Sequence, residues 1–599
     1  MKSIKSFAVL LISISLLAGA CKKNLEKEFQ NPDNYGETGN LFGGVWTNML
    51  YSWKLYVQDY GEIWWDIQGS GCLGVRNYTQ IAFRYIRNND GRGYFTEYDD
   101  LSGVGGFGND GQLRNNRLAD YYTRLRGWAV IKDNISKVSG AELTDNKIYF
   151  SLATVLKDYQ ALRMVDFYNS IPYSEAFKGS EQVFFPKYDD PREIYVSVLD
   201  ELKAISEALP EEYAAMSEVA KATFNTQDIA FEGNIEKWVQ YVNAIRLRFA
   251  VRLSGVEESI AKTHIQDIVT KNNLPTTDMT WLFPNQLEND PFSGGTCVRG
   301  WKEGIFSTFI PNVIMRRMNR DHTLYQPGID DPRLPVLACA TKYSQFNATP
   351  QVGDFRGVSM DANANQPIHD GGERYQVGDP TQDLANAFIN NAVSPYNYAT
   401  FHRNLNFPNY MMSMAEVDLL LAEVALKNLA TTPKTAGDYI KDAIVHSTPF
   451  WFAINESSTF ARGTAILAAR TMYPPRPSDA DVNTYADSVR NRFNTRADMD
   501  DQMEILMQQK FIHLNLIDSY ELWAELRRTR HPKLEPMSYL AKVLMKPLPE
   551  RLRYPNSEQQ TNADNYQLVK DQDNFTSPIF WVPPSLRTVV PYWNDSNFE

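Results

Sequence analysis

Side chains able to perform acid–base or nucleophilic catalysis are scattered along the sequence and match no known catalytic motif. The sequence contains no His-Glu-x-x-His, no Gly-x-Ser-x-Gly and no glycine-rich phosphate loop ending in Gly-Lys-Ser/Thr. The seven histidines occur singly, and His513 lies on a long predicted helix, where we expect a core or surface residue and not a ligand. Aspartates and glutamates are numerous enough to allow a glycosidase-type carboxylate pair. No strand–helix alternation that would position such a pair is visible, so we predict that the protein is not an enzyme.

A different chemistry is indicated near the N-terminus, where Cys21 follows an apolar segment. Lys2 and Lys5 precede the mostly apolar residues 7–17, as in an export signal. This run is about half of the roughly 20 residues that a membrane-spanning helix needs. Leu17-Ala18-Gly19-Ala20-Cys21 resembles a bacterial lipobox, although Ala18 stands where Leu or Val is usual. The resemblance implies that the cysteine sulfur takes a diacylglycerol. The two or three acyl chains of a lipoprotein, palmitate among them, together anchor it stably.

Composition describes the rest of the chain as a large, acidic, water-soluble body. The net charge of -12 and the pI near 5.3 argue against a nucleic-acid partner, which requires a basic face. Cys72, Cys297 and Cys339 are widely spaced and form no Cys-x-x-Cys, so neither a disulfide framework nor a zinc site is indicated. We therefore predict a signal peptide at 1–20, a lipidated, turn-rich tether at 21–45 and a single domain at 46–599.

The elements that must position any site are predicted to be helices. Apolar residues recur at three- and four-residue steps in five segments, at about 148–162, 194–209, 238–253, 417–424 and 502–527. Pro210 is expected to end the second of these. Residues 66–115 and 275–410 are instead rich in Gly, Pro, Asn, Asp and aromatic residues. The sequence thus predicts a mainly α-helical scaffold carrying long loops, and such loops are usually functional.

Several motifs along the chain resemble one protein family. The segment Asp166-Phe167-Tyr168-Asn169-Ser170-Ile171-Pro172-Tyr173-Ser174-Glu175-Ala176 resembles the D-x-Y-G-x-x-P-Y-x-E-A segment of the SusD/RagB family, the outer-membrane nutrient-binding lipoproteins of Bacteroidota. Asn169 stands where the family has Gly, and Asn is the residue that best tolerates positive φ after Gly. Further matches follow in the family's order: Lys237-Trp238, residues 243–252, Asp331-Pro332-Arg333-Leu334, residues 416–423, Trp523 with Arg527 and Arg528, and Arg553-Tyr554-Pro555.

The resemblance implies a fold, a location and a function. The fold would be the SusD-like helical fold, built on tetratricopeptide-like helix pairs with long aromatic-rich loops. The protein would lie on the cell outer membrane, facing the exterior, and would pass its ligand to a SusC-like TonB-dependent barrel transporter. The ligand would be an oligosaccharide, with peptide capture by a RagB-like lipoprotein as the alternative and a surface glycoside hydrolase as the least favoured one. No cofactor and no metal are expected.

Most of the motif residues are interpreted as structural. Arg246, Arg248 and Arg252 lie on a helix that is predicted to be largely buried, and buried charges must be paired. We expect them to pair with Asp166, Glu416 or Glu423 and so to hold helices together. Pro172 and Tyr173 are expected to fix the exit of a helix pair, and Asp331-Pro332-Arg333 to form a turn held by the aspartate side chain.

The predicted ligand contacts are aromatic residues of the two loop regions. Sugar-binding members of the family stack sugar rings on loop Trp and Tyr side chains, and each stack contributes about 0.5–1.5 kcal/mol beyond area burial. The candidates are Trp64, Trp65, Tyr94 and Tyr98 in the first region and Trp281, Arg299 and Trp301 in the second. Trp301 is preferred because Gly294, Gly295 and Gly300 precede it in a segment without periodicity. Trp238, Trp451 and Trp523 lie on helical patterns and are expected in the core.

Overall fold

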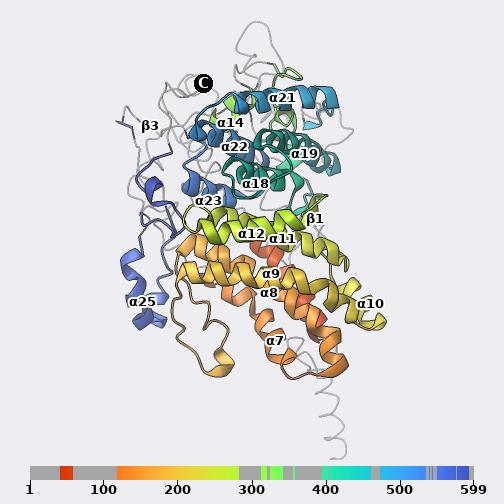
Figure 1. Cartoon of the computed structure of the whole chain (residues 1–599), viewed down its shortest axis with the longest axis vertical. Coiled ribbons are helices and arrows are strands. Elements are labelled where there is room, and N and C mark those ends of the chain that lie inside the picture. Colours follow the sequence, from red (N-terminus) through yellow and green to blue (C-terminus); the bar gives the residue numbers. More distant parts are fainter. Residues whose placement is uncertain are drawn as a thin grey trace, which may run out of the picture.

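The computed structural model is mainly α-helical, which confirms the predicted fold class (Figure 1). Its strands form only two short two-stranded sheets among the residues that the structure describes. The structure describes residues 41–58, 118–119, 121–281, 310, 312–319, 324–340, 355, 357, 394, 396–402, 404–459, 472–534, 538–539, 542–543, 550–574 and 576–591.

The helices of the lower half in Figure 1 pack one on the next in chain order. Helix α8 packs on α9, α9 on α11 and α11 on α12, in the pairwise manner that the resemblance implies. Their apolar faces, with the fully buried Trp238, form the largest hydrophobic core. The helices of this half are α2 (Leu41–Gln58), α7 (Arg126–Ile135), α8 (Gly140–Tyr168), α9 (Pro191–Ala215), α10 (Glu218–Gln227), α11 (Ile235–Leu253) and α12 (Glu258–Lys271).

The upper half repeats this packing with α18 on α19, α19 on α21 and α21 on α22. Side-chain caps start these helices: the hydroxyl of Ser413 accepts from the amide of Glu416, and that of Ser478 from the amide of Asp481. Helix α11 contacts α18 and joins the halves. The helices are α14 (Asn312–Met318), α15 (Leu334–Leu337), α18 (Met414–Leu426), α19 (Ala436–Ser457), α21 (Asp479–Asn494), α22 (Met499–Leu514) and α23 (Ser519–Thr529).

The C-terminal segment returns to the lower half and packs against α8. Trp581 is fully buried, and its indole Nε1 donates to Asp166 at the end of α8 at 2.7 Å. The hydroxyl of Tyr554 donates to the carbonyl of Ser170 at 2.6 Å. The remaining elements are the strands β1 (Met279–Trp281), β2 (Asn409–Met412), β3 (Ser538–Tyr539) and β4 (Lys542–Val543) and the helices α24 (Glu558–Thr561) and α25 (Ala563–Val569).

Two predicted helix boundaries are wrong. Helix α9 continues past Pro210 to Ala215, because Glu212 beyond the proline is bound to α8 by Ser151 at 2.7 Å and Lys147 at 3.2 Å. The segment 502–527 is two helices, α22 and α23, instead of one. The break is at Asn515, where φ is +33°, and the carboxylate of Asp518 caps the second helix by accepting from the amide of Glu521. A polar residue able to adopt positive φ, followed by an N-cap, interrupts a continuous apolar pattern.

Candidate functional site

The predicted ligand contacts fall mainly outside the described residues. Trp281 ends strand β1, where its backbone pairs with that of Asn409 in β2. Its side chain lies outside the described part. The same is true of all atoms of Cys21 and of the other candidates, which are Trp64, Trp65, Tyr94, Tyr98, Arg299 and Trp301. What the structure describes is the scaffold from which the second loop region emerges.

The β1–β2 ladder forms the base of that region. Met279 pairs with Met412, Thr280 with Tyr410 and Trp281 with Asn409, in antiparallel register with an irregularity after Met279. The pairing of Trp281 with Asn409 therefore brings together the two ends of the range 282–408, whose described part includes α14 and α15. A long segment that begins and ends at one place on a rigid frame can present side chains in a fixed setting.

The ladder is fixed to the start of α18 by polar contacts. The carboxylate of Asp278, next to β1, accepts from the amide of Met414 at 2.9 Å. At the end of β2, the hydroxyl of Tyr410 donates to Glu416 at 2.5 Å. Because Glu416 also pairs with α11, the base of the loop region is coupled to the centre of the fold.

That coupling is a fork between two fully buried side chains. The Nε and Nη2 atoms of Arg248 donate to the two carboxylate oxygens of Glu416, each at 2.8 Å. Bidentate pairing of this kind satisfies both groups in a fixed geometry. The predicted pairing of an α11 arginine with Glu416 is confirmed.

Arg252, one turn further along α11, joins three helices. Its guanidinium donates to Asp166 of α8 and to Glu521 of α23, and lies 3.5 Å from Glu525. Asp166 also accepts from Tyr195 and Trp581. The predicted pair with Asp166, the first residue of the family motif, is confirmed.

The other expected pairings differ from the prediction. Arg246 donates to the Nδ1 atom of His264 at 3.0 Å and to Asp267 at 2.8 Å, both of α12, because its position on α11 faces that helix. Glu423 is paired with Arg528 of α23, at 2.6 and 2.7 Å, instead of with an arginine of α11. The cationic Arg528 and Lys427 hold the pKa of Glu423 well below its ordinary value, against the opposing effect of burial.

This charged network is part of the packed interior. A cavity of about 10 Å³ lies among Arg163, Asp166, Arg248, Asp518 and Glu521. Such a space holds about one water molecule and no nutrient. The network therefore positions helices and does not contact a ligand directly.

A serine–histidine contact in the upper half resembles a catalytic pair but is also buried. The imidazole of His513 lies 2.6 Å from the hydroxyl of Ser413 and 2.8 Å from that of Ser447, and it is fully buried. Burial, with Arg333 and Lys510 nearby, lowers the pKa of His513 to about 3. A neutral imidazole between two hydroxyls links α18, α19 and α22 and leaves no room for a substrate.

The family-like segment after α8 has the backbone expected of it. Asn169 ends α8 with φ at +68°, which confirms the prediction that asparagine takes the conformation of the family's glycine. Its side-chain oxygen accepts from the amide of Phe580 at 2.8 Å. The carbonyl of Pro172 accepts from Tyr122 at 2.7 Å. These contacts fix the exit of the helix pair, as expected for Pro172.

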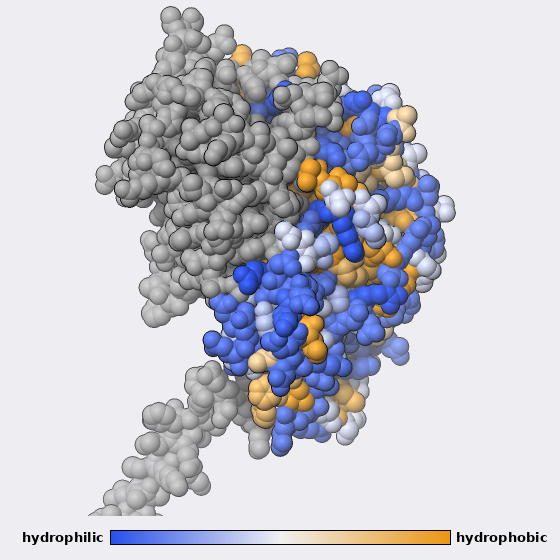
Figure 2. All heavy atoms as spheres, turned by 90° about the vertical axis from the view of Figure 1, so that its left-hand side faces the viewer, coloured by the Kyte–Doolittle hydropathy of each residue, from blue (hydrophilic) through white to orange (hydrophobic). Residues whose placement is uncertain are grey.

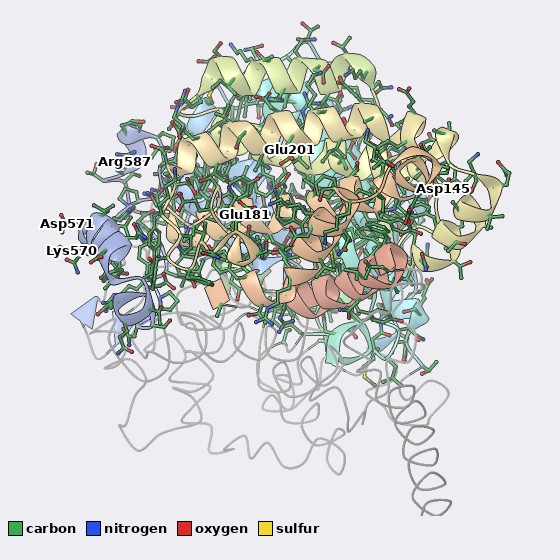
Figure 3. All side chains as sticks on the ribbon, turned by 90° about the horizontal axis from the view of Figure 1, so that it is seen from below. Asp145, Glu181, Glu201, Lys570, Asp571 and Arg587 are labelled. Atoms are coloured by element: carbon green, nitrogen blue, oxygen red, sulfur yellow. The ribbon has the colours of Figure 1, made fainter. Side chains whose placement is uncertain are left out.

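Tyr173 binds a buried pair on α8 that the motif analysis did not single out. Its hydroxyl lies 3.0 Å from Lys157 Nζ and donates to Asp158 at 2.9 Å, and Lys157 lies 2.8 Å from Asp158. Lys157 is in turn 3.6 Å from Glu201 of α9, at the surface (Figure 3). Burial raises the pKa of Asp158 to about 7 despite the lysine.

The Asp331 turn is formed as predicted. The carboxylate of Asp331 accepts from the amide of Arg333 at 2.9 Å and from its guanidinium at 2.8 Å. Arg333 also donates to Gln509 of α22 at 2.6 Å.

In the described part of the chain, no helix is both long and apolar enough to cross a membrane. No group of three or more potential ligand side chains that could hold a metal ion occurs among the same residues.

Solved structures with a similar fold include a chitin-binding protein and several SusD homologues. A chitin-binding protein shares 21% identity, with a TM-score of 0.58 over 88% of this chain and 99% of its own. A SusD homologue from Bacteroides uniformis shares 19% identity, with a TM-score of 0.59 over 91% and 99%. An outer-membrane protein of Bacteroides vulgatus, for which a role in nutrient binding is proposed, shares 18%, with a TM-score of 0.54 over 89% and 99%. No curated protein sequence matches the chain.

The family comparison covers most of the sequence. Residues 77–555 match the SusD-like family model described as "starch-binding associating with outer membrane". This range includes the Asp166 motif, the arginines of α11, the Asp331 turn and the second loop region. The chain therefore belongs to the SusD-like family of starch-binding proteins associated with the outer membrane.

Proposed function

We propose that this protein is a cell-surface lipoprotein that captures oligosaccharides and passes them to a SusC-like TonB-dependent transporter. The observation that carries the proposal is the family match over residues 77–555, whose description names starch binding and the outer membrane. The similar fold of a chitin-binding protein supports a carbohydrate ligand. The descriptions of starch binding for the family and of chitin binding for this structure favour oligosaccharide over peptide as the ligand class.

The ligand site is proposed in the loop region that leaves the β1–β2 ladder. Trp281 lies at its base, and Arg299 and Trp301 follow within the same region. Trp64, Trp65, Tyr94 and Tyr98 would complete the site from the first region. Aromatic rings bind the apolar C–H faces of sugars, and two or three stacks give affinities from millimolar to tens of micromolar. Such affinities suit capture followed by release to a transporter.

The anchor is proposed to be a lipid on Cys21. Two or three acyl chains would hold the protein on the outer membrane. The long helical scaffold would then carry the ligand loops at the cell exterior.

Trp301 offers the most specific test of the proposed site. In calorimetric titrations with a glycan that the wild type binds, Trp301→Ala should weaken binding by about 1–3 kcal/mol, the magnitude of an aromatic anchor. Trp301→Phe is the matched control, since it keeps a ring and should retain most of the affinity. Equal binding by wild type and Trp301→Ala would remove Trp301 from the site.

A further inference from the structure

The loop between α8 and α9 exposes two consecutive aromatic side chains. Phe184 and Phe185 are 69% and 67% exposed, and Leu568 on the neighbouring α25 is 81% exposed. The described surface on one side of the molecule is mostly hydrophilic, with several apolar areas (Figure 2). Large apolar side chains that remain together in water commonly mark a contact surface. We call Phe184, Phe185 and Leu568 the apolar tip.

The backbone that carries the apolar tip is held in place from both sides. Asn565 of α25 donates to the carbonyl of Phe185 at 3.0 Å, and Asn562 donates to that of Pro186 at 2.9 Å. Leu568 follows Asn565 by three residues on the same helix, so the two lie on adjoining sides of it. The exposure of the rings is therefore a property of a fixed loop.

The following residues tie the loop to the family motif. The carboxylate of Asp189 accepts from the amides of Tyr173 and Ser174, each at 2.8 Å. The hydroxyl of Tyr188 donates to Glu558 of α24 at 2.5 Å. The apolar tip is thus supported by contacts that reach α8 and the C-terminal segment alike.

The size of the apolar tip suits a lipid surface better than a protein partner. An aromatic side chain buries about 150–250 Å² when fully covered, so the three exposed side chains offer roughly 400 Å² together. A stable protein interface needs about 800 Å² on each side. Insertion of side chains into a bilayer surface requires no minimum buried area. A weak contact is enough to orient a protein that a lipid already tethers to the membrane.

Charges of both signs border the apolar tip. Lys178 and Lys187 flank the rings, and Glu181 of the same loop lies 3.5 Å from Lys132. Lys570 and Asp571 follow Leu568 (Figure 3). On the uncharged surface of zwitterionic lipid, attraction would come from the apolar side chains and would depend little on salt.

The first described helix, α2, belongs to the lower half of the molecule, as do α25 and the loop between α8 and α9 (Figure 1). Helix α2, the first described element, packs on α7 and α8 of the lower half. Seen from below in Figure 3, α2, the loop with Glu181 and α25 are all visible. Leu41 is the first described residue, and the 20 residues back to Cys21 span at most about 70 Å. A lipid on Cys21 would keep this end near the bilayer.

We propose that the apolar tip inserts into the surface of the lipid bilayer and orients the tethered body on the membrane. This inference rests on the proposed membrane location and is independent of the ligand. The side chains of Phe184, Phe185 and Leu568 enter the headgroup region, while the hydrogen-bonded loop backbone stays outside it.

The test uses the full mature chain without its lipid, made by replacing Cys21 with Ala, and phosphatidylcholine vesicles. In co-sedimentation, Phe184→Ser/Phe185→Ser should lower the partition coefficient at least tenfold. Val219→Ser is the matched control, since Val219 is a 79% exposed apolar residue on α10, outside the apolar tip, and it should change nothing. Raising the salt from about 0.1 M to about 1 M should leave partitioning unchanged.

Hydrogen exchange of residues 182–187 provides a second measurement. Vesicles should slow exchange of this segment in the wild type and leave the α10 segment unaffected. The proposal is overturned if the unmodified tip does not partition, or if the double serine variant partitions as well as its parent. It is also overturned if the tip instead drives self-association without lipid binding. Glycan binding by the double variant should be unchanged, so failure here is separable from failure of the proposed function.

Discussion

Removal of the guanidinium of Arg252 tests whether the buried ion pairs hold the helices together. Arg252→Met keeps much of the side-chain volume while leaving Asp166 and Glu521 without their shared partner. The side chain of Arg252 is 1% exposed, so water cannot replace the lost charge. Asp166 would keep two neutral donors, Tyr195 and Trp581.

The expected loss is large compared with total stability. Removing one partner of a buried ion pair costs about 3–5 kcal/mol, because an uncompensated charge is left inside. The value should lie near the lower end, since Lys510 remains 3.4 Å from Glu521. Whole domains are stable by only about 5–15 kcal/mol. We therefore expect a clearly lower unfolding midpoint, and the double variant Arg252→Met/Glu521→Gln should lose less than the sum of the single variants.

Urea unfolding followed by far-UV circular dichroism measures this effect. The matched control is Arg476→Met, which removes an arginine that likewise donates two hydrogen bonds, both to Glu456, at 2.5 and 2.7 Å, where both side chains are about half exposed. Exposed pairs contribute about 0–1 kcal/mol, so this variant should unfold almost as the wild type does. If Arg252→Met destabilises the protein no more than Arg476→Met, the network does not carry the role assigned to it.

Three further predictions concern the anchor, a buried carboxyl and a turn. Cys21→Ala should leave the protein folded but release it from the outer-membrane fraction, and its retention there in a strain without the transporter would contradict the lipid anchor. In the folded state Asp158 holds its proton up to its pKa of about 7, whereas in the unfolded chain it loses the proton near pH 4. The free energy of unfolding should therefore fall by up to ~4 kcal/mol as the pH rises from about 4 to about 7. Asp158→Asn should flatten that dependence in unfolding titrations, and an unchanged pH profile would count against it. The Asn169→Ala variant should be about 1–2 kcal/mol less stable than Asn169→Gly, because φ is +68° at this position. Equal stability of the two variants would refute this backbone strain.

Much of the fold could be predicted from the sequence because the helices carry regular apolar faces. The helices over 148–162 and 238–253 and the buried Trp238, Trp451 and Trp523 were predictable for this reason. The break at residues 515–518 was not, since apolar residues continue across it and mask the short interruption of the helix. Pro210 led to the opposite error, a helix predicted to end too early, because the tertiary contact of Glu212 outweighs the helix-breaking effect of the proline.

The sequence could predict that the buried arginines pair with acidic side chains, but it identified only some of the partners. Three arginines on an apolar helix must find acids, and Arg248 and Arg252 do so with Glu416 and Asp166. The partner of Arg246 depends on which neighbour its position on α11 faces, and sequence spacing does not contain that information. The Lys157–Asp158 pair had a signal that was overlooked, namely two adjacent charges within the apolar run of 148–162. The ligand residues remain predictions, because they lie outside the described residues or, for Trp281, are described only as backbone.

The most direct test of the proposed function is a calorimetric titration of the mature wild-type chain with two ligand panels. One panel contains oligosaccharides of plant, host and microbial origin, and the other contains oligopeptides. The proposed function predicts that at least one oligosaccharide binds with a dissociation constant between millimolar and tens of micromolar, and that the oligopeptides do not bind. Binding of oligopeptides with no response to any glycan would contradict oligosaccharide capture and would assign the protein to peptide uptake.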